Sequence, residues 1–358
     1  MFTSVQAAVM RHGRLIIDEI DDPEPAAGQV LARTIACGIC GSDLHALRHG
    51  DKMVEMSRIG ALEAGPVSPH VMDLSHDVVM GHEFCAEVVE LGRNTGQCQE
   101  GDIVVSMPVL FAPSGLHPLG YSNDYPGGYA ERMVLSDMLT LAVPNGLDPR
   151  HAALTEPMAV GVHAVNKSGI APGEAAVVLG CGPVGLAVTA ALARLGVDTI
   201  VAADFSATRR ELATIMGATE TVDPSTESAV QAWRRVDGRK SLVMFEAVGV
   251  PGMIDEAMLD APRGGRLVIV GVCMETDRLR PMLGVMKELS IQFALGYDPT
   301  EFADTLRAIA EGEFDVAPLI TGSVDLPGVP QAFEELADPD RHAKLLVEPA
   351  QPGAETCR

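Results

Sequence analysis

Residues 175–204 of the chain read AAVVLGCGPVGLAVTAALARLGVDTIVAAD, and this stretch decides the fold. The short apolar run at 175–180 predicts a strand, the apolar spacing of 183–195 predicts a helix, and 198–204 predicts a second strand. Gly196 follows the helical segment, at the place where glycine commonly ends a helix. A strand, a crossover helix and another strand form a βαβ unit, so we expect the two strands to be parallel.

The same alternation continues beyond this unit. Residues 207–217 predict a helix, 241–249 a strand, 251–261 a helix and 264–272 a strand. Strands that alternate with helices are typical of a parallel, doubly wound α/β sheet. Upstream, the β-rich runs at 29–36 and 101–109 predict that the first 150 or so residues are mostly β with loops. From about residue 298 the pattern loosens, and 342–349 predicts a last strand.

Length and charge limit the classes of protein. A chain of 358 residues predicts two domains, since a domain has about 100 to 200 residues. The chain carries 26 Lys and Arg against 49 Asp and Glu, a net charge of −23, which would repel nucleic acid and anionic membranes. We therefore expect no nucleic-acid or membrane partner, and a small-molecule substrate instead.

Two further absences bear on location. The chain has no apolar run long enough to span a membrane, and residues 1–20 contain charges where a signal peptide would be apolar. We therefore expect a cytoplasmic protein. Its seven cysteines are an odd number and are spread thinly, which favours free thiols or metal ligands over a disulfide framework.

The turn after the first strand of the βαβ unit predicts a phosphate-binding site. It reads Gly180-Cys181-Gly182-Pro183-Val184-Gly185 and fits G-x-G-x-x-G in the required strand–turn–helix context. Gly180 permits the tight turn, Gly182 lets a pyrophosphate approach the backbone, and Gly185 lets the helix pack closely. The amides that begin the helix, from Val184 onward, would face the anion.

An acidic residue at the end of the next strand selects the cofactor. Asp204 lies 19 positions after Gly185, where a carboxylate accepts hydrogen bonds from the adenosine ribose. Its charge would repel a 2′-phosphate, which favours NAD over NADP. Arg209 and Arg210 leave NADP open as an alternative, although we expect both on the following helix, one of them beside the adenine.

Residues 37–45 read CGICGSDLH and suggest a metal site. A C-x-x-C pair alone could be a redox pair, half of a zinc knuckle or two unrelated thiols. No second close pair of cysteines completes a knuckle, and no thioredoxin-like setting surrounds the pair. A catalytic zinc needs only three protein ligands, which can come from distant segments.

Five motifs together carry a family resemblance. They are ACGICGSDLH at 36–45, VMGHEF at 79–84, GGYAE at 127–131, TEPMAVGVHA at 155–164 and GCGPVGL at 180–186. In this order, over nearly the whole chain, they resemble the zinc-dependent medium-chain alcohol dehydrogenases, in the branch of the sorbitol, threonine and butanediol dehydrogenases. The resemblance implies a mostly β GroES-like catalytic domain at 1–156, a Rossmann NAD-binding domain with a doubly wound parallel sheet at 157–296, and a return to the catalytic domain at 297–358.

The resemblance also implies the metal ligands. Cys40 and His82 would bind the zinc, and Glu156 of T-E-P would bind it directly or through a water. Glu83 would be an exchangeable ligand or an acceptor behind the ligands, and Asp43 would orient the His82 ring. Against this, Glu156 before Pro157 could simply be a carboxylate at a helix start.

The implied reaction is hydride transfer between an alcohol, expected to be secondary, and NAD, giving a ketone or aldehyde. Ser42 would accept the hydroxyl proton and His45 would pass it outward through the nicotinamide ribose, unless Ser42 is a turn residue and His45 a surface one. A zinc-free quinone or enoyl reductase of the same fold and a non-catalytic NAD(H)-binding protein remain as alternatives. The family resemblance further implies a homodimer or homotetramer built on the sheet edge at 280–294.

Two departures from the family pattern lead to further predictions. Residues 106–131 lack the cysteines of the family's second, structural zinc, so we expect one zinc per chain and a lobe held by proline, glycine and aromatic packing. The 42 positions from Cys40 to His82 are more than usual, and the extra residues fall at 49–77 within the segment 46–80. We predict that this segment lines or covers the substrate pocket and favours larger alcohols over ethanol, although its methionines at 53, 56 and 72 are equally typical of a core.

Overall fold

The computed structural model describes residues 4–63 and 69–349 of the chain. The chain packs into two units. The first unit comprises Met1–Glu156, Ile320–Ala337 and Lys344–Arg358, and the second comprises Pro157–Leu319 and Asp338–Ala343. Because the chain leaves the first unit and returns to it, the first and the last of the described residues belong to the same unit.

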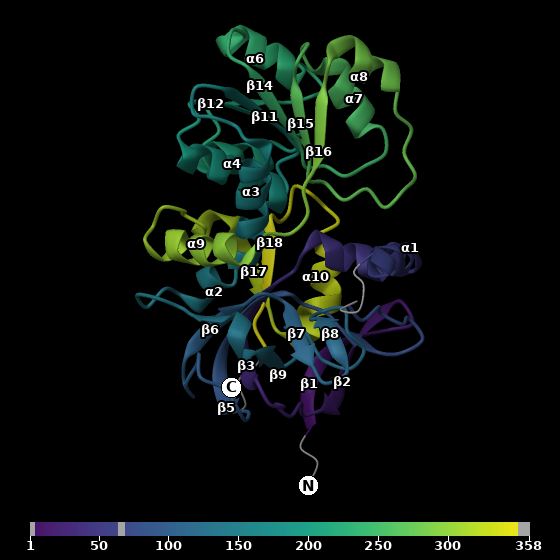
Figure 1. The fold of residues 1–358 in the computed structure, drawn as a ribbon, viewed down its shortest axis with the longest axis vertical. Helices are drawn as coiled ribbons and strands as arrows, with labels where there is room; N and C mark the ends of the chain where they lie inside the picture. Colours follow the sequence, from purple (N-terminus) through teal and green to yellow (C-terminus); the bar gives the residue numbers. More distant parts are fainter. Residues whose placement is uncertain (1–3, 64–68, 350–358) are drawn as a thin grey trace. The chain divides into compact units, whose positions relative to one another are not determined.

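The first unit is built mainly from strands (Figure 1). Its strands are β1 Ser4–Arg11, β2 Arg14–Asp21, β3 Gln29–Gly38, β4 Val78–Val79, β5 Glu83–Leu91, β6 Ile103–Ser106, β7 Val109–Ala112, β8 Gly115–Pro118, β9 Arg132–Ser136, β10 Thr140–Ala142, β17 Ile320–Val324 and β18 Lys344–Val347. Its helices are α1 Gly41–Glu63, α2 Pro149–Ala152 and α10 Val329–Glu335. Short 3₁₀ turns lie at Asp137–Leu139 and Leu326–Gly328.

Strand β3 organises the largest sheet of the first unit. The strand order is β10-β6-β5-β3-β18-β17, and β9 also pairs with β3. The antiparallel register places Gly38 of β3 opposite both Glu83 of β5 and Leu346 of β18. The end of β3 therefore meets the starts of two strands that are distant in sequence. The smaller sheets are β2-β1-β4 and the hairpin β7-β8.

The second unit alternates strands and helices (Figure 1). Its elements are α3 Thr155–Ser168, which begins in the first unit, β11 Ala175–Leu179, α4 Pro183–Leu195, β12 Thr199–Ala203, α5 Ala207–Ile215, β13 Glu220–Val222, α6 Ala229–Asp237, β14 Leu242–Glu246, α7 Met253–Asp260, β15 Arg266–Ile269, α8 Pro281–Lys287, β16 Ser290–Phe293, α9 Pro299–Ala310 and a 3₁₀ turn at Ala317–Leu319. The six strands run in the order β13-β12-β11-β14-β15-β16, and all pairs are parallel. The predicted doubly wound sheet is confirmed.

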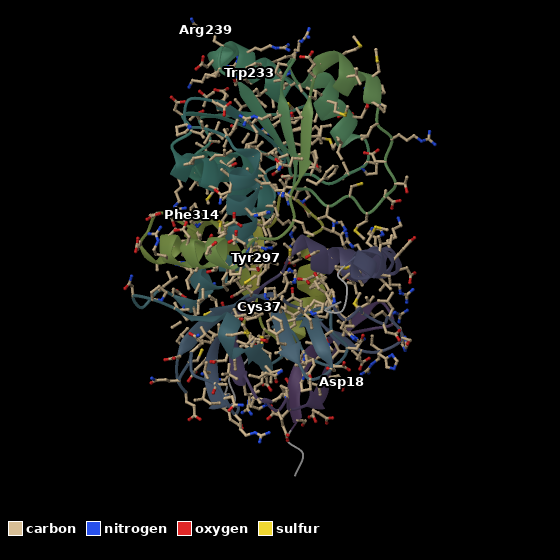
Figure 2. The ribbon with its side chains drawn as sticks, in the orientation of Figure 1. Asp18, Cys37, Trp233, Arg239, Tyr297 and Phe314 are labelled. Atoms are coloured by element: carbon tan, nitrogen blue, oxygen red, sulfur yellow. The ribbon has the colours of Figure 1, made fainter. Side chains whose placement is uncertain are left out.

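The central strands of this sheet are buried on both faces. One set of alternate residues, including Val177 of β11 and Val201 of β12, packs in a core with α6 and α7. Their neighbours Val178 and Ala202 point to the opposite face and are also inaccessible to solvent. Trp233 of α6, labelled in Figure 2, is 5% exposed in the first of these cores. Burial on both faces explains why these strands read as continuous apolar runs.

Local predictions in the second unit match the structure closely. The helix predicted at 183–195 is α4, and Gly196 ends it in the left-handed conformation at φ 85°. The helix α5 and the strands β11, β12, β14 and β15 also lie within their predicted ranges.

The first 150 residues are mostly β as expected, and helix α1 is an element that the sequence analysis did not predict. It occupies the first 23 residues, Gly41–Glu63, of the segment between Cys40 and His82, with a kink at His49. Met53 packs against the core of the first unit and Met72 is buried in it, which supports the alternative that these methionines are core residues. Met56 is 53% exposed. Part of this segment, 64–68, and the tail from 350 that contains Cys357 lie outside the described residues.

The second domain boundary also differs from the sequence-based one. The predicted return at 297 is too early, because residues 297–319 stay with the second unit. Ion pairs hold α9 there: Glu301 accepts from His163 of α3 at 2.8 Å, and Asp304 pairs with Arg194 of α4 at 2.9 Å. The chain rejoins the first unit at Ile320.

Candidate metal centre and cofactor turn

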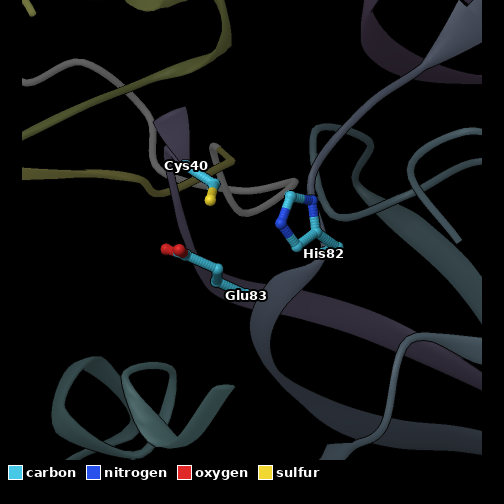
Figure 3. Close-up of side chains that lie close together, drawn as sticks. All are labelled: Cys40, His82 and Glu83. Carbon is cyan, nitrogen blue, oxygen red and sulfur yellow. The ribbon is translucent and has the colours of Figure 1, made fainter. Parts of the chain in front are cut away.

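Three of the four predicted ligands come together in the first unit. Cys40 lies between β3 and α1, while His82 and Glu83 lie at the start of β5. The register that pairs Gly38 with Glu83 brings these segments side by side. The ligand atoms of Cys40, His82 and Glu83 all lie within 4.8 Å of one another (Figure 3). Cys40 is partly exposed, whereas His82 and Glu83 are buried.

The side chain of Asp43 contacts both Cys40 and His82. Its side chain accepts a hydrogen bond from the Cys40 amide at 3.1 Å, which is half of a capping box at the start of α1. Tyr129 donates to the same carboxylate at 2.7 Å, and His82 Nδ1 lies 3.3 Å from Oδ1. Although burial alone would raise the pKa of Asp43, the charge of His82 and these hydrogen bonds hold it below its usual range.

The Asp43 carboxylate also sets the state of His82. Burial would lower the pKa of His82, but the Asp43 charge and Cys40 raise it well above its usual value. With Nδ1 facing Asp43, Nε2 is the nitrogen left for a metal, as in other sites where a carboxylate orients a ligating histidine. Asp43 therefore occupies the orienting position that the sequence analysis assigned to it.

Glu83 is held by a buried lysine that the sequence analysis did not single out. Lys344, at the start of β18, donates to both Glu83 carboxylate oxygens at 2.7 Å and to the Ile39 carbonyl at 3.1 Å. The two side chains are 3% and 0% exposed. Burial would lower the pKa of Lys344, but Glu83, Cys40 and Glu156 raise it.

Glu156 is not in the group that converges on Cys40. It lies in the first turn of α3, as the alternative reading of a helix-start carboxylate describes. Its charge nonetheless raises the pKa of Lys344, so it acts on the same buried lysine as Glu83.

The two predicted proton carriers lie on α1. Ser42 Oγ is 3.3 Å from His82 Nε2, and Tyr121 donates a hydrogen bond to it at 2.9 Å. His45 follows three positions later, so it shares a helix face with Ser42. Burial of His45, together with His49 and Arg48, lowers the pKa of His45. A neutral imidazole is the form that can accept a proton.

The donors present fit zinc. A thiolate, an imidazole nitrogen and a carboxylate are the ligand types that zinc prefers, and a catalytic site uses three of them with one position open. Here a buried carboxylate, Asp43, already orients the imidazole. Cys40, His82 and a glutamate are therefore a suitable set of zinc ligands.

A second group of potential ligands has another explanation. His70, His117 and Asp124 also lie within 4.8 Å of one another. Both ring nitrogens of the buried His117 are hydrogen-bonded to serine hydroxyls, Ser114 at 2.8 Å and Ser122 at 3.0 Å. Because its nitrogens already have partners, His117 connects the parts of the lobe. Aromatic packing contributes as well, since Tyr125 contacts the His117 ring edge-on at 4.8 Å.

The glycines of the predicted phosphate turn behave differently from one another. Gly180 has φ 90°, and a Cβ there would approach Val248 at 2.8 Å. A Cβ on Gly185 would collide with the Gly180 carbonyl, so this position requires glycine for packing. A Cβ on Gly182 would meet nothing within 4 Å, which leaves open space beside this backbone. Val184 follows Pro183 in the first turn of α4.

Asp204 lies beside this turn. One carboxylate oxygen accepts from the Cys181 amide at 2.8 Å and the other from the Ser206 amide at 2.9 Å. A carboxylate has about four lone-pair sites, so two remain for ribose hydroxyls. Arg209 and Arg210 are on α5 as predicted. Arg210 donates to the Asp204 and Phe205 carbonyls and pairs with Asp223 at 3.5 Å. The buried Nε of Arg209, by contrast, has no hydrogen-bond partner among the residues that the structure describes.

Tyrosines are the other residues that the sequence analysis missed. The chain has four, and three of them, Tyr121, Tyr125 and Tyr129, fall within nine residues. Tyr129 is buried and Tyr121 is half-buried, and the hydroxyls of both contact Asp43. The concentration of tyrosines in this short segment is the sequence signal that could have identified them.

Comparisons with known proteins agree with the fold and the donor set. Residues 26–145 match the alcohol dehydrogenase GroES-like domain, and 183–311 match the zinc-binding dehydrogenase family. (R,R)-butanediol dehydrogenase of Bacillus subtilis is 32% identical over 346 residues, covering 93% of this chain and 96% of that protein. The solved structure of 2R,3R-butanediol dehydrogenase from Bacillus subtilis has a TM-score of 0.82 and 31% identity, covering 97% of this chain and all (100%) of that one.

A nicotinamide cofactor is present in another similar structure. A candidate zinc-binding dehydrogenase from Sinorhizobium meliloti, solved with NADP bound, has a TM-score of 0.80 and 28% identity and covers 97% of this chain and 100% of that one. The matches and the site define the class of protein as a zinc-binding oxidoreductase with a nicotinamide cofactor.

The chain belongs to the zinc-dependent medium-chain alcohol dehydrogenase family. The predicted fold and the predicted activity on alcohols are confirmed. Within the described residues, no helix is both long and apolar enough to cross a membrane.

Proposed function

We propose that this protein oxidises a secondary alcohol with NAD and a single catalytic zinc, in the reversible reaction alcohol plus NAD⁺ to ketone plus NADH plus a proton. The observation that carries the proposal is that the ligand atoms of Cys40, His82 and Glu83 lie close together, with the His82 ring oriented by Asp43. When bound, the zinc supplies a Lewis acid that polarises the alcohol oxygen and lowers its pKa. A nicotinamide cofactor held at the Gly180–Gly185 turn would supply the acceptor for the hydride of the carbinol carbon, and the proton of the hydroxyl would pass to a residue of the chain.

The residues of the chain would divide the remaining work. Cys40 and His82 hold the metal, and Asp43 fixes the His82 ring through Nδ1. Ser42 takes the hydroxyl proton, and His45 on the same face of α1 receives it in its neutral form.

The third ligand is a glutamate, and Lys344 bears on which one. Lys344 neutralises Glu83 in a buried ion pair, which favours Glu83 as an exchangeable zinc ligand. Glu156 would then be the permanent third ligand, bound to zinc directly or through a water. Zinc content after Glu83→Gln and Glu156→Gln separates the two roles. The variant that loses zinc on dialysis identifies the permanent ligand.

For the cofactor, we propose NAD. Asp204 next to the Gly180–Gly185 turn has lone pairs for the ribose hydroxyls, and its charge opposes a 2′-phosphate. Of the two arginines that could offset this charge, Arg210 is engaged by Asp223 and by two carbonyls. Arg209 on α5 is the residue through which NADP stays the alternative.

For the substrate, we propose a secondary alcohol, because the proteins similar to this chain include a dehydrogenase of (R,R)-butanediol, whose hydroxyls are secondary. We also propose that part of the segment 46–80 lines the substrate pocket. Residues of this segment that pack in the core of the first unit, such as Met72, are not candidates for this role. Its exposed apolar residues on α1, Met56 and Ile59, are the candidates for it.

For assembly, we propose a homodimer or homotetramer formed at the free edge of the six-stranded sheet. Strand β16 is the last strand in the order. The apolar residues exposed on it and beside it are Met282, Val285, Met286, Phe293 and Leu295, which are 62–88% exposed. An exposed apolar strand edge of this kind is typical of a surface that pairs with another chain.

The test of the activity combines metal analysis with a substrate screen. We expect one zinc per chain, and NAD reduction with secondary alcohols and diols at higher kcat/KM than with ethanol. Cys40→Ala and His82→Ala should abolish turnover while NADH binding, measured by titration, is kept. Full activity in either variant, or in protein without zinc, would contradict the proposed centre. Two tightly held zincs per chain would contradict the single site.

A further inference from the structure

Tyr121 contacts the proposed proton carrier directly. It lies just after β8, where its amide donates to the Pro118 carbonyl at 3.1 Å. Its single hydroxyl proton is shared between Ser42 Oγ at 2.9 Å and Asp43 Oδ1 at 3.2 Å. Its ring lies 5.4 Å from the His82 ring, with 38° between the planes. One side chain from the lobe therefore touches three residues of the metal centre.

These contacts restrict Ser42 more than helix α1 alone would. A serine side chain has three staggered rotamers, and its hydroxyl proton rotates freely. Because Tyr121 donates to Ser42 Oγ, one lone pair of that oxygen is used and the Ser42 proton must point elsewhere. His82 Nε2 also lies 3.3 Å from Ser42 Oγ, but this nitrogen is the one left for a metal. Tyr121 is therefore the contact that fixes the rotamer of Ser42 and occupies one lone pair of its oxygen.

Tyr129 provides an internal comparison. It donates to the other oxygen of Asp43 at 2.7 Å and to the Gly38 carbonyl at 3.3 Å, and its side chain is fully buried. Both tyrosines hold Asp43, but the hydrogen bond to Ser42 comes from Tyr121. Tyr129 therefore contacts the metal site through Asp43, whereas Tyr121 also contacts Ser42, the proposed proton carrier.

We propose that Tyr121 is a positioning residue for the reaction, which holds the Ser42 hydroxyl in the orientation that accepts the alcohol proton. This inference rests on the proposed function of Ser42. The tyrosine takes no part in the bonds that form or break.

The experiment compares Tyr121→Phe with Tyr125→Phe, a matched loss of one hydroxyl in the same lobe. Tyr125 packs on His117, so its variant should keep wild-type kinetics. Tyr121→Phe keeps the ring but loses the donor, and we expect kcat to fall about tenfold, the value of one hydrogen bond. Its KM for NAD and its zinc content should stay the same. The solvent deuterium isotope effect on kcat should rise, because proton removal becomes slower.

A double-mutant cycle tests whether the effect passes through Ser42. In the Ser42→Ala background, Tyr121→Phe should change kcat less than twofold, because the oriented hydroxyl is already gone. Equal losses in both backgrounds, or lost zinc in Tyr121→Phe, would overturn the inference. If Ser42→Ala is impaired while Tyr121→Phe matches wild type, the inference alone fails. If Ser42→Ala keeps full activity, the proposed function of Ser42 fails, and the inference fails with it.

Discussion

Replacing Lys344 by methionine should destabilise the first unit strongly. The three protons of its ammonium group have three acceptors, the two oxygens of Glu83 at 2.7 Å and the Ile39 carbonyl at 3.1 Å. Lys344→Met removes the charge and keeps much of the volume. It leaves the Glu83 carboxylate, which is 0% exposed, without its cation.

The size of the effect follows from this geometry. Two charges 2.7 Å apart attract each other by about 6 kcal/mol at an effective dielectric constant of about 20. The variant loses this attraction but no longer has to desolvate the lysine, so we expect a net loss of about 3–5 kcal/mol, as for other buried pairs with one partner removed. With a urea m-value of about 2–3 kcal/mol/M, the midpoint should fall by about 1–2 M.

Urea unfolding of zinc-free protein measures this loss. Far-UV circular dichroism follows both units, while the fluorescence of Trp233, the only tryptophan in the chain, follows the second unit. We expect the circular dichroism transition of the first unit to move and the Trp233 transition to move less. Arg150→Met is the control, since its pair with Glu348 at 2.9 Å is about 40% exposed and should cost less than about 1 kcal/mol.

A second variant decides whether the pair itself is responsible. Lys344→Met combined with Glu83→Gln removes both charges, so it should recover at least half of the loss. A cost of less than about 1 kcal/mol for Lys344→Met, or strictly additive costs in the double variant, would refute the reasoning.

Three further predictions concern the cofactor, the thiols and the assembly. At about 5 Å, Asp204 should oppose a 2′-phosphate by about 3 kcal/mol, so kcat/KM should favour NAD by about a hundredfold and Asp204→Ser should remove most of that preference; equal values in the wild type would contradict this. Burial raises the pKa values of Cys85, Cys98 and Cys181 to about 12, so these thiols stay protonated at pH 8 and should react with a disulfide reagent only slowly, and faster as the pH approaches 12. Rapid labelling of the Cys181 peptide at pH 8, detected by mass spectrometry, would argue against that. Leu295→Asp places a charge on the residue that is 88% exposed beside β16, and light scattering should then show a smaller assembly, whereas an unchanged mass would exclude this edge as the interface.

The parts of the fold that the sequence predicted are those with local causes. The unit β11–α4–β12 follows from an apolar run, a helical period and Gly196, all within 30 residues. Helix α9 was within reach as well, because Asp298 and Glu301 form a capping box with Pro299 at the first turn. Helix α1 was harder to predict, since it contains Gly50 and Gly60 and is kinked at His49.

The residues of the site can also be divided into those with a local sequence signal and those without one. Cys40, His82, Ser42 and Asp43 could be predicted because they lie in compact motifs. The pairing of Lys344 with Glu83 spans 261 positions and depends on the register of β18 against β3, which no local pattern contains. The contact of Tyr121 with Ser42 spans 79 positions and depends on the path of the lobe.

The discontinuous first unit has a consequence for synthesis on the ribosome. Residues 1–156 emerge first, and β5 and β9 within them can pair with β3. The end of β3 at Cys37 and Gly38 lacks its β18 partner, and Glu83 lacks its cation, until residues 344–347 have been made. The second unit, almost continuous from 157 to 319, can fold while the first is still waiting. The nascent chain therefore lacks the partner of the end of β3 and the cation of Glu83 through most of translation. If translation stops before residue 344, the released chain would have a folded second unit and an incomplete first unit.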